Sequence, residues 1–165
     1  MLPTPEGVRA QWAAGRPDLD TSPMEVVGLL KQINALLAQA FEPLYETAPV
    51  TPSEVDILIT LRYAERPAIA CRLAEHHGLS RAGMSKTLAK LEKRGYITRT
   101  PNPADRRAAL VTITPTGATT IDSFFPGQLA VEAALLSPLG NDRDGVVAAL
   151  TLLSQTLQTA LTRRA

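Results

Sequence analysis

Hydrophobic positions recur every three to four residues through most of this chain, and that period predicts amphipathic helices. Only one short region, near residue 110, shows the alternation that a half-buried strand requires. The pattern therefore predicts a mainly helical protein with a little β-structure. The predicted helices cover residues 4–14, 23–45, 53–64, 68–77, 80–94, 115–136 (with an interruption at Pro126) and 142–161.

Local signals at the helix starts support these assignments. The capping-box spacing, in which a Ser or Thr is followed three residues later by Glu, occurs at Ser22–Glu25 and at Thr51–Glu54. Thr4 precedes Pro5 as an N-cap precedes a first-turn proline, and Asn141 is placed to cap the last helix. In the second capped helix, over 53–64, the side chains of Val55, Leu58, Ile59 and Tyr63 are expected to face inward.

Residues 68–114 change character in a definite order. The helix over 68–77 ends at Gly78, which suits a tight turn, and Ser80 is a good N-cap for a second helix that Gly95 ends. On this second helix the apolar residues share one face and the lysines share the opposite face. The apolar face consists of Met84, Leu88 and Leu91, and the basic face of Lys86, Lys90 and Lys93.

A hairpin with a long basic connection follows, with strands predicted over 96–100 and 109–114. The connection between them reads PNPADRRA, and its two prolines stiffen it. A stiff loop carrying Arg106 and Arg107 suits the narrow, electronegative minor groove of DNA. Asp105 is expected to pair with Arg107 and to hold that side chain extended.

Charge is concentrated in this part of the chain. Residues 80–107 hold eight Lys or Arg and two acids, a net charge of +6, whereas the whole chain carries +1 and its remainder −5. A basic block on an otherwise acidic protein indicates a surface that faces a polyanion. A solvated helix face is the alternative explanation for the lysines.

The segment LSRAGMSKTLAKLEKRGYITRTPNPADRRAALVTITPTG resembles the MarR-type winged helix-turn-helix transcription regulators. The resemblance lies in the Leu-Glu-x-Arg-Gly-Tyr-Ile helix exit, the Asp-Arg-Arg wing and the Ile-Thr-Pro-x-Gly that follows it. It implies a homodimer on palindromic double-stranded DNA, a small-molecule or redox signal, and by expectation a repressor. The expected domains are N-terminal dimerisation helices (1–50), a winged helix-turn-helix (51–114) and C-terminal dimerisation helices (115–165).

On this interpretation, the second helix of the motif lies in the major groove and the wing in the minor groove. The apolar stripe over 23–45 is wider than one neighbour could bury, which indicates a subunit interface. The expected DNA contacts on the helix are made by Ser80, Arg81, Ser85, Lys86, Thr87 and Lys90, and those on the wing by Arg106 and Arg107.

The N-terminal segment RAQWAAGRPDLDTSPMEVVGLL resembles the extra helix of the urate-responsive PecS-like branch of that family. The resemblance implies a ligand site that includes Trp12 and Asp56. Where that branch uses arginines in the recognition helix, this chain has Thr87 and Lys90. A urate-like anion needs cationic hydrogen-bond donors, so the expected ligand is stated more broadly as an anionic or aromatic small molecule. Alternatively, Trp12 pins the N-terminal arm and Asp56 interacts with the dipole of its helix.

Other classes of function find little support in the sequence. There is no glycine-rich phosphate loop, no Ser/His/Asp set and no Cys/His cluster, so we expect no enzyme, cofactor or metal. His76 and His77, being adjacent on a helix, are not expected to face one another. Cys71 is expected to be a buried hydrophobe, with a redox sensor as the alternative. No unbroken apolar run approaches 18 residues, so we expect a cytoplasmic protein; a winged-helix module for protein contact is a further alternative.

Overall fold

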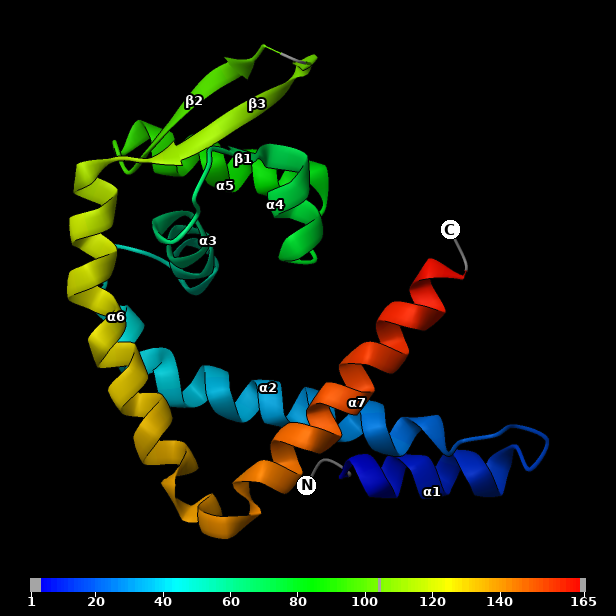
Figure 1. The fold of residues 1–165 in the computed structure, drawn as a ribbon. Helices are drawn as coiled ribbons and strands as arrows, with labels where there is room; N and C mark the ends of the chain where they lie inside the picture. The colour runs from blue at the N-terminus through cyan, green and yellow to red at the C-terminus, as the bar shows by residue number, and fades with distance from the viewer. Residues whose placement is uncertain (1–3, 104, 164–165) are drawn as a thin grey trace. The chain divides into compact units, whose positions relative to one another are not determined.

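A computed structural model of the chain describes residues 4–103 and 105–163, and the side chains of Arg106 and Arg107 lie outside that description. The residues form two compact units, Met1–Gln128 and Leu129–Ala165. In chain order the elements are α1 (Pro5–Gly15), α2 (Pro23–Glu46), α3 (Pro52–Arg62), β1 (Ala68–Ile69), α4 (Ala70–His76), α5 (Arg81–Lys93), β2 (Ile97–Asn102), β3 (Asp105–Ile113), α6 (Pro115–Leu136), the 3₁₀ helix η1 (Ser137–Asp142) and α7 (Arg143–Thr162). This confirms the predicted mainly helical fold with a small β-wing (Figure 1).

The sheet has three antiparallel strands in the order β1-β3-β2, one more than predicted. Ala68 pairs with Val111 and Ile69 with Leu110, so the residues predicted to begin a helix instead extend the sheet. The α4 helix begins two residues later, at Ala70. The backbone groups of Ala68 and Ile69 form hydrogen bonds with β3. These bonds outweigh those that a further half-turn of helix would provide.

The wing is also shorter at its tip than the sequence predicts. Instead of an eight-residue connection, β2 continues to Asn102 and β3 begins at Asp105, and these two residues pair across the turn. An irregularity in register lies between Pro101 and Asn102. Pro101 is tolerated there because β2 is an edge strand. Proline has no backbone N–H, and on an edge strand its absence need not cost a hydrogen bond to a neighbouring strand. The prediction of a long loop that carries Asp105, Arg106 and Arg107 is therefore wrong, because all three residues belong to β3.

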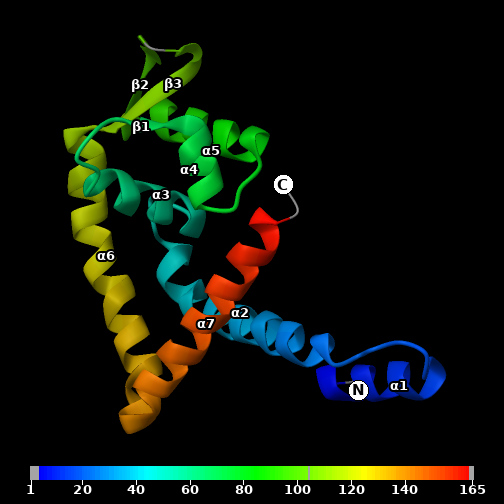
Figure 2. The ribbon, with the colours of Figure 1, turned by 45° about the vertical axis from the view of Figure 1, so that its right-hand side comes forward.

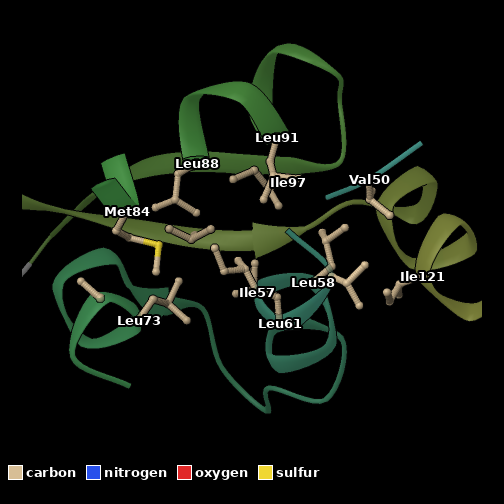
Figure 3. Close-up of a cluster of buried hydrophobic side chains, with 13 residues drawn as sticks. Val50, Ile57, Leu58, Leu61, Leu73, Met84, Leu88, Leu91, Ile97 and Ile121 are labelled. Carbon is tan, nitrogen blue, oxygen red and sulfur yellow. The ribbon is translucent and has the colours of Figure 1, made fainter. Parts of the chain in front are cut away.

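The core of the first unit lies where α3, α4, α5, the sheet and the beginning of α6 meet (Figure 3). The predicted inner face of α5 is confirmed, because Met84, Leu88 and Leu91 are all buried. The α3 helix contributes Ile57 and Leu61, which the sequence analysis did not single out, whereas Tyr63 is 75% exposed. Tyr63 was expected to face inward, but α3 ends at Arg62 and leaves Tyr63 as the C-cap on the surface.

Three of the five predicted N-caps are confirmed: Thr4, Thr51 and, as described below, Ser80. The Thr4 hydroxyl accepts a hydrogen bond from the Gly7 N–H (3.1 Å), and Thr51 with Glu54 forms a capping box. Ser22 precedes α2 as predicted, but its capping box does not form, and the prediction for Asn141 is wrong. Ser22 has helical backbone angles and no side-chain cap, and its N–H instead donates to Asp20, while the position before α7 is occupied by Asp142.

The second unit consists of the end of α6, η1 and α7. Gly140, within η1, has φ +49°, a left-handed conformation that a glycine adopts without strain. The apolar residues of α7 are exposed in the single chain, among them Leu150, Leu152 and Leu157. Between Pro115 and Thr162 an 18-residue window reaches a mean hydropathy of 1.2, so this stretch meets a length-and-composition test for a membrane span, a test that core helices of other proteins also meet.

A close approach joins the end of α5 to the beginning of α6. The Thr114 hydroxyl accepts a hydrogen bond from the Gly117 N–H (3.0 Å), and the Thr114 N–H donates to the carbonyl of Tyr96 (3.0 Å). A Cβ atom on Gly117 would lie 2.1 Å from that same carbonyl oxygen. The Ile-Thr-Pro-x-Gly motif thus has a steric explanation, since only glycine leaves room for the Tyr96 backbone.

We expect Gly117→Ala to destabilise the protein by about 3 kcal/mol, because the new methyl group collides with backbone that cannot move aside. Gly127→Ala is the matched control: it lies in the same helix, its Cβ would meet only the Leu44 side chain at 3.6 Å, and it should gain up to about 1 kcal/mol in helix propensity. Urea denaturation measures both changes. Equal stabilities for the two variants would contradict the steric explanation.

Candidate nucleic-acid interface

Each of the two helices of the helix-turn-helix ends in a turn that contains a glycine with positive φ. At the end of α4 the Gly78 N–H donates to the Glu75 carbonyl and the next N–H, of Leu79, donates to Ala74, and Gly78 has φ +62°. Gly95 ends α5 in the same way with φ +73°. This arrangement satisfies the last carbonyls of each helix and turns the chain sharply. As a result α4 packs against α5 beneath the sheet (Figures 1 and 2).

The predicted start of α5 is confirmed in detail. Ser80 is the N-cap, and its hydroxyl accepts a hydrogen bond from the Gly83 N–H at 3.0 Å. Thr87 is half-buried, and its hydroxyl donates to the Gly83 carbonyl at 3.2 Å. Both hydroxyls are thus already used within α5, whereas Ser85 is exposed.

The outer face of α5 is basic and accessible. The side chains of Lys86, Lys90 and Lys93 are exposed on the face opposite the buried Met84, and Arg81, in the first turn of the helix, is exposed as well. Because the apolar face is held in the core, these cations are presented to solvent together. Within α5 the one acid is Glu92, which is half-buried at the end of the helix.

Glu92 is neutralised by an arginine from the wing. The Arg99 Nε donates to Glu92 Oε2 at 2.8 Å, and a second guanidinium nitrogen contacts the same oxygen. The hydrogen bond from Arg99 lowers the pKa of Glu92 below its ordinary value, so the pair is ionised near neutral pH. The pair ties α5 to β2 and uses a cation that the sequence analysis had counted toward the polyanion-facing surface.

Arg94 is used in the same way, on a buried partner. Its Nη2 lies 2.7 Å from Oε1 of Glu54, whose side chain is only 4% exposed. Its Nη1 donates to the Pro49 carbonyl at 2.7 Å, and the guanidinium lies 5.0 Å from the centre of the Tyr96 ring. Burial raises the pKa of Glu54, but the hydrogen bonds from Arg94 and from the Thr51 backbone outweigh it, and the net shift is downward.

The basic block therefore contains two kinds of cation. Arg94 and Arg99 hold the fold together, whereas Arg81 and the three lysines of α5 face outward. Sequence reasoning missed this division because the partner of Arg94 lies on another helix, far away in the chain. The one signal near Glu54 was its place in the predicted capping box with Thr51, which gives no indication of a partner at the end of α5.

The predicted wing contacts fall at the margin of what the structure describes. The backbone of Arg106 and Arg107 belongs to β3, and their side chains lie outside the described part of the chain. The expected pairing of Asp105 with Arg107 thus remains a prediction.

The two predicted ligand residues lie on different helices. Trp12 is on α1, is 51% exposed, and belongs to a helix that packs along the N-terminal half of α2. Asp56 is exposed on α3, which follows the C-terminal end of α2. Within one chain the structure does not bring these two side chains together.

His76 and His77 differ from the expectation for adjacent helical residues. Their ring centres are 4.9 Å apart in an edge-to-face arrangement, because His77 is the C-cap of α4 and has left the helical spiral. The His77 Nε2 lies 3.2 Å from the Thr60 hydroxyl. Burial, with a smaller contribution from His76, lowers the pKa of His77, and Asp56 opposes this shift. Cys71, in the first turn of α4, is half-buried.

The arrangement of α4, α5 and the β2–β3 hairpin is that of a winged helix-turn-helix protein. Residues 50–109 match the sequence profile of the MarR family. The regulator PecS of Dickeya dadantii (strain 3937) is 29% identical over 137 residues, which are 80% of this chain and 81% of that protein. Residues 50–109 are thus a MarR-family domain, and the chain is similar to a MarR-type transcriptional regulator over most of its length, which confirms the predicted family resemblance and the prediction that it is not an enzyme.

Solved structures share the fold at low sequence identity. Sco3205 of Streptomyces coelicolor, a MarR-family regulator in complex with DNA, has a TM-score of 0.74 at 19% identity, covering 85% of this chain and 90% of its own. BpsR of Bordetella bronchiseptica, whose DNA binding is regulated by 6-hydroxynicotinic acid, has a TM-score of 0.71 at 22% identity, covering 78% and 92%. At these identities the likeness establishes the fold alone.

Proposed function

We propose that this regulator is a repressor that binds a palindromic operator as a homodimer, with α5 of each subunit in the major groove. The observation that carries the proposal is the division of α5 into a buried apolar face and an opposite, exposed face of three lysines. A helix fixed on one side and basic on the other fits the major groove and neutralises phosphates beside it. The structure of Sco3205, which shares the fold, was solved in complex with DNA, and this supports DNA as the partner.

Within this proposal the exposed side chains of α5 divide the work. Arg81, Lys86 and Lys90 contact phosphates or base edges, and Ser85 adds a hydroxyl. Ser80 and Thr87, whose hydroxyls already bond to the helix backbone, contribute only through their remaining hydrogen-bonding capacity. A further set of contacts comes from the wing, where Arg106 and Arg107 enter the minor groove.

We expect Lys86→Ala to weaken operator binding and to lower the slope of log K against log salt by about 2 per dimer, close to 0.9 for each lost phosphate contact. Lys31→Ala, which removes an exposed lysine from α2, is the matched control and should leave the slope unchanged. Fluorescence anisotropy across a salt series measures both. If Lys86→Ala kept the wild-type slope of log K against log salt, the proposal that α5 contacts DNA phosphates through Lys86 would be contradicted.

The homodimer is supported by apolar surface that a single chain leaves uncovered. No residue of α2 is buried, and Val26, Leu29, Ile33 and Leu36 are all about half exposed. The α7 helix of the second unit is likewise without a buried residue. A second copy of the chain buries such faces, and its two-fold axis sets two α5 helices about 34 Å apart on successive major grooves.

Sedimentation is expected to show the wild-type protein at twice the 17.7 kDa of one chain. Leu36→Glu should shift it toward the monomer, because a charge at a 57% exposed apolar position would be buried on association. Gln39→Glu, an exposed polar position on the same helix, should remain dimeric. A dimer that persists undiminished in Leu36→Glu would place the subunit interface elsewhere.

We infer that a small anionic or aromatic molecule lowers the affinity of the repressor for DNA. The likeness to PecS over 80% of the chain supports a site that uses Trp12 and Asp56, as the resemblance of the N-terminal segment to the PecS-like branch implies. Since these residues lie on different helices of one chain, such a site depends on how the arms pack in the cytoplasmic dimer.

A thermal-shift screen with urate, other purines, salicylate-like acids and citrate-like acids tests this inference. At least one compound should stabilise the wild-type protein and should not stabilise Trp12→Ala. Tyr63→Ala, which removes another exposed aromatic side chain, should respond as the wild type does. The absence of any shift in the wild type would leave the ligand site without support.

A further inference from the structure

Three segments of the first unit meet at the C-terminal end of α5. One is the connection from α2 into α3 together with the first turn of α3, which contribute the Pro49 carbonyl and Glu54 respectively. The second is the helix exit itself, from Arg94 to Tyr96. The third is the connection from β3 into α6, which begins at Thr114. The chain enters the winged domain through the first of these segments and leaves it through the third.

Arg94 holds the entering segment at two points. Its guanidinium donates to the Pro49 carbonyl (2.7 Å) and pairs with Glu54 (2.7 Å). Glu54 in turn accepts a hydrogen bond from the Thr51 N–H (2.9 Å), which fixes the first turn of α3. A planar guanidinium can make both contacts at once while lying over the Tyr96 ring, and an ammonium cannot reproduce that geometry.

The connection from β3 into α6 also forms hydrogen bonds with the residues that follow α5. The Thr114 hydroxyl donates to the Gly95 carbonyl (2.6 Å), and the Thr114 N–H donates to the Tyr96 carbonyl (3.0 Å). Gly117 packs directly against that carbonyl. Both chain connections are therefore fastened to three consecutive residues that follow the recognition helix.

We propose that Arg94 is a positioning residue that sets the orientation of the recognition helix relative to α2 and α6, and so the distance between the two α5 helices of a dimer. This inference rests on the proposed function. Arg94 does not contact DNA in this role, because its guanidinium is occupied by Glu54 and Pro49. Its effect appears in which spacing of operator half-sites the dimer accepts.

The experiment uses the full-length chain and duplexes derived from the operator that the wild-type protein selects from random DNA. The spacing between the half-sites is then varied by one base pair in either direction, a rotation of about 35° per step. Two variants are compared with the wild type. Arg94→Lys keeps the charge, and the double variant Glu54→Gln/Arg94→Gln removes the pair without leaving a buried charge unpaired.

For both variants we expect a folded dimer, an unchanged salt slope and a flattened spacing profile. The wild type should disfavour either altered spacing by about tenfold or more, as one misplaced half-site contact implies, and the variants by about threefold or less. Arg72→Lys is the matched control, since Arg72 forms an exposed ion pair with Glu75 within α4, and it should keep the wild-type profile.

Each other outcome overturns the inference. A reduced salt slope would make Arg94 a phosphate contact, and an unchanged spacing profile would make its contacts irrelevant to the geometry of the dimer. Loss of folding in both variants would make the ion pair a requirement of the fold alone. If the wild-type protein selects no palindrome, the proposed function itself fails, and this result is distinguishable because it does not involve the variants.

Discussion

The burial of one face of α5 is the constraint on which the rest of the molecule depends. Met84, Leu88 and Leu91 are each no more than 1% exposed, and they meet side chains from α3, α4, the sheet and α6. Close packing of this kind leaves the helix a single rotational setting, because any turn about its axis would expose apolar surface and bury lysine. The direction in which the basic face points is therefore decided by the core and not by the lysines themselves.

The role of each basic side chain near the end of α5 depends on the residues that surround it in the fold. Arg94 and Lys93 are adjacent in sequence, yet Lys93 is exposed whereas Arg94 is paired with a buried glutamate. A buried carboxylate is tolerated only when it is paired and hydrogen-bonded, and Glu54 meets that condition through Arg94 and the Thr51 N–H. Arg94, which follows the last residue of the recognition helix, thus has a structural role, and the exposed basic face of that helix ends at Lys93.

The apolar residues that a single chain leaves exposed are a second organising feature. The α2 and α7 helices have apolar stripes, and neither contains a buried residue. Exposed apolar patches of this extent are uncommon on monomeric proteins and mark surfaces that associate. The winged domain, in contrast, completes its own core within the chain, which explains why it is recognisable from its sequence alone.

The sequence by itself determined the features that depend on residues a few positions apart. The helical period, the Ser80 and Thr4 caps, the glycine ends of α4 and α5 and the two faces of α5 were all predictable, because each is set within one or two turns of helix. Only the tertiary structure decided the rest. Pairing of β1 with β3, the Arg94–Glu54 and Arg99–Glu92 pairs and the approach of Gly117 to Tyr96 all join segments that no local pattern relates, since their contact energy exists only once the core has brought them together.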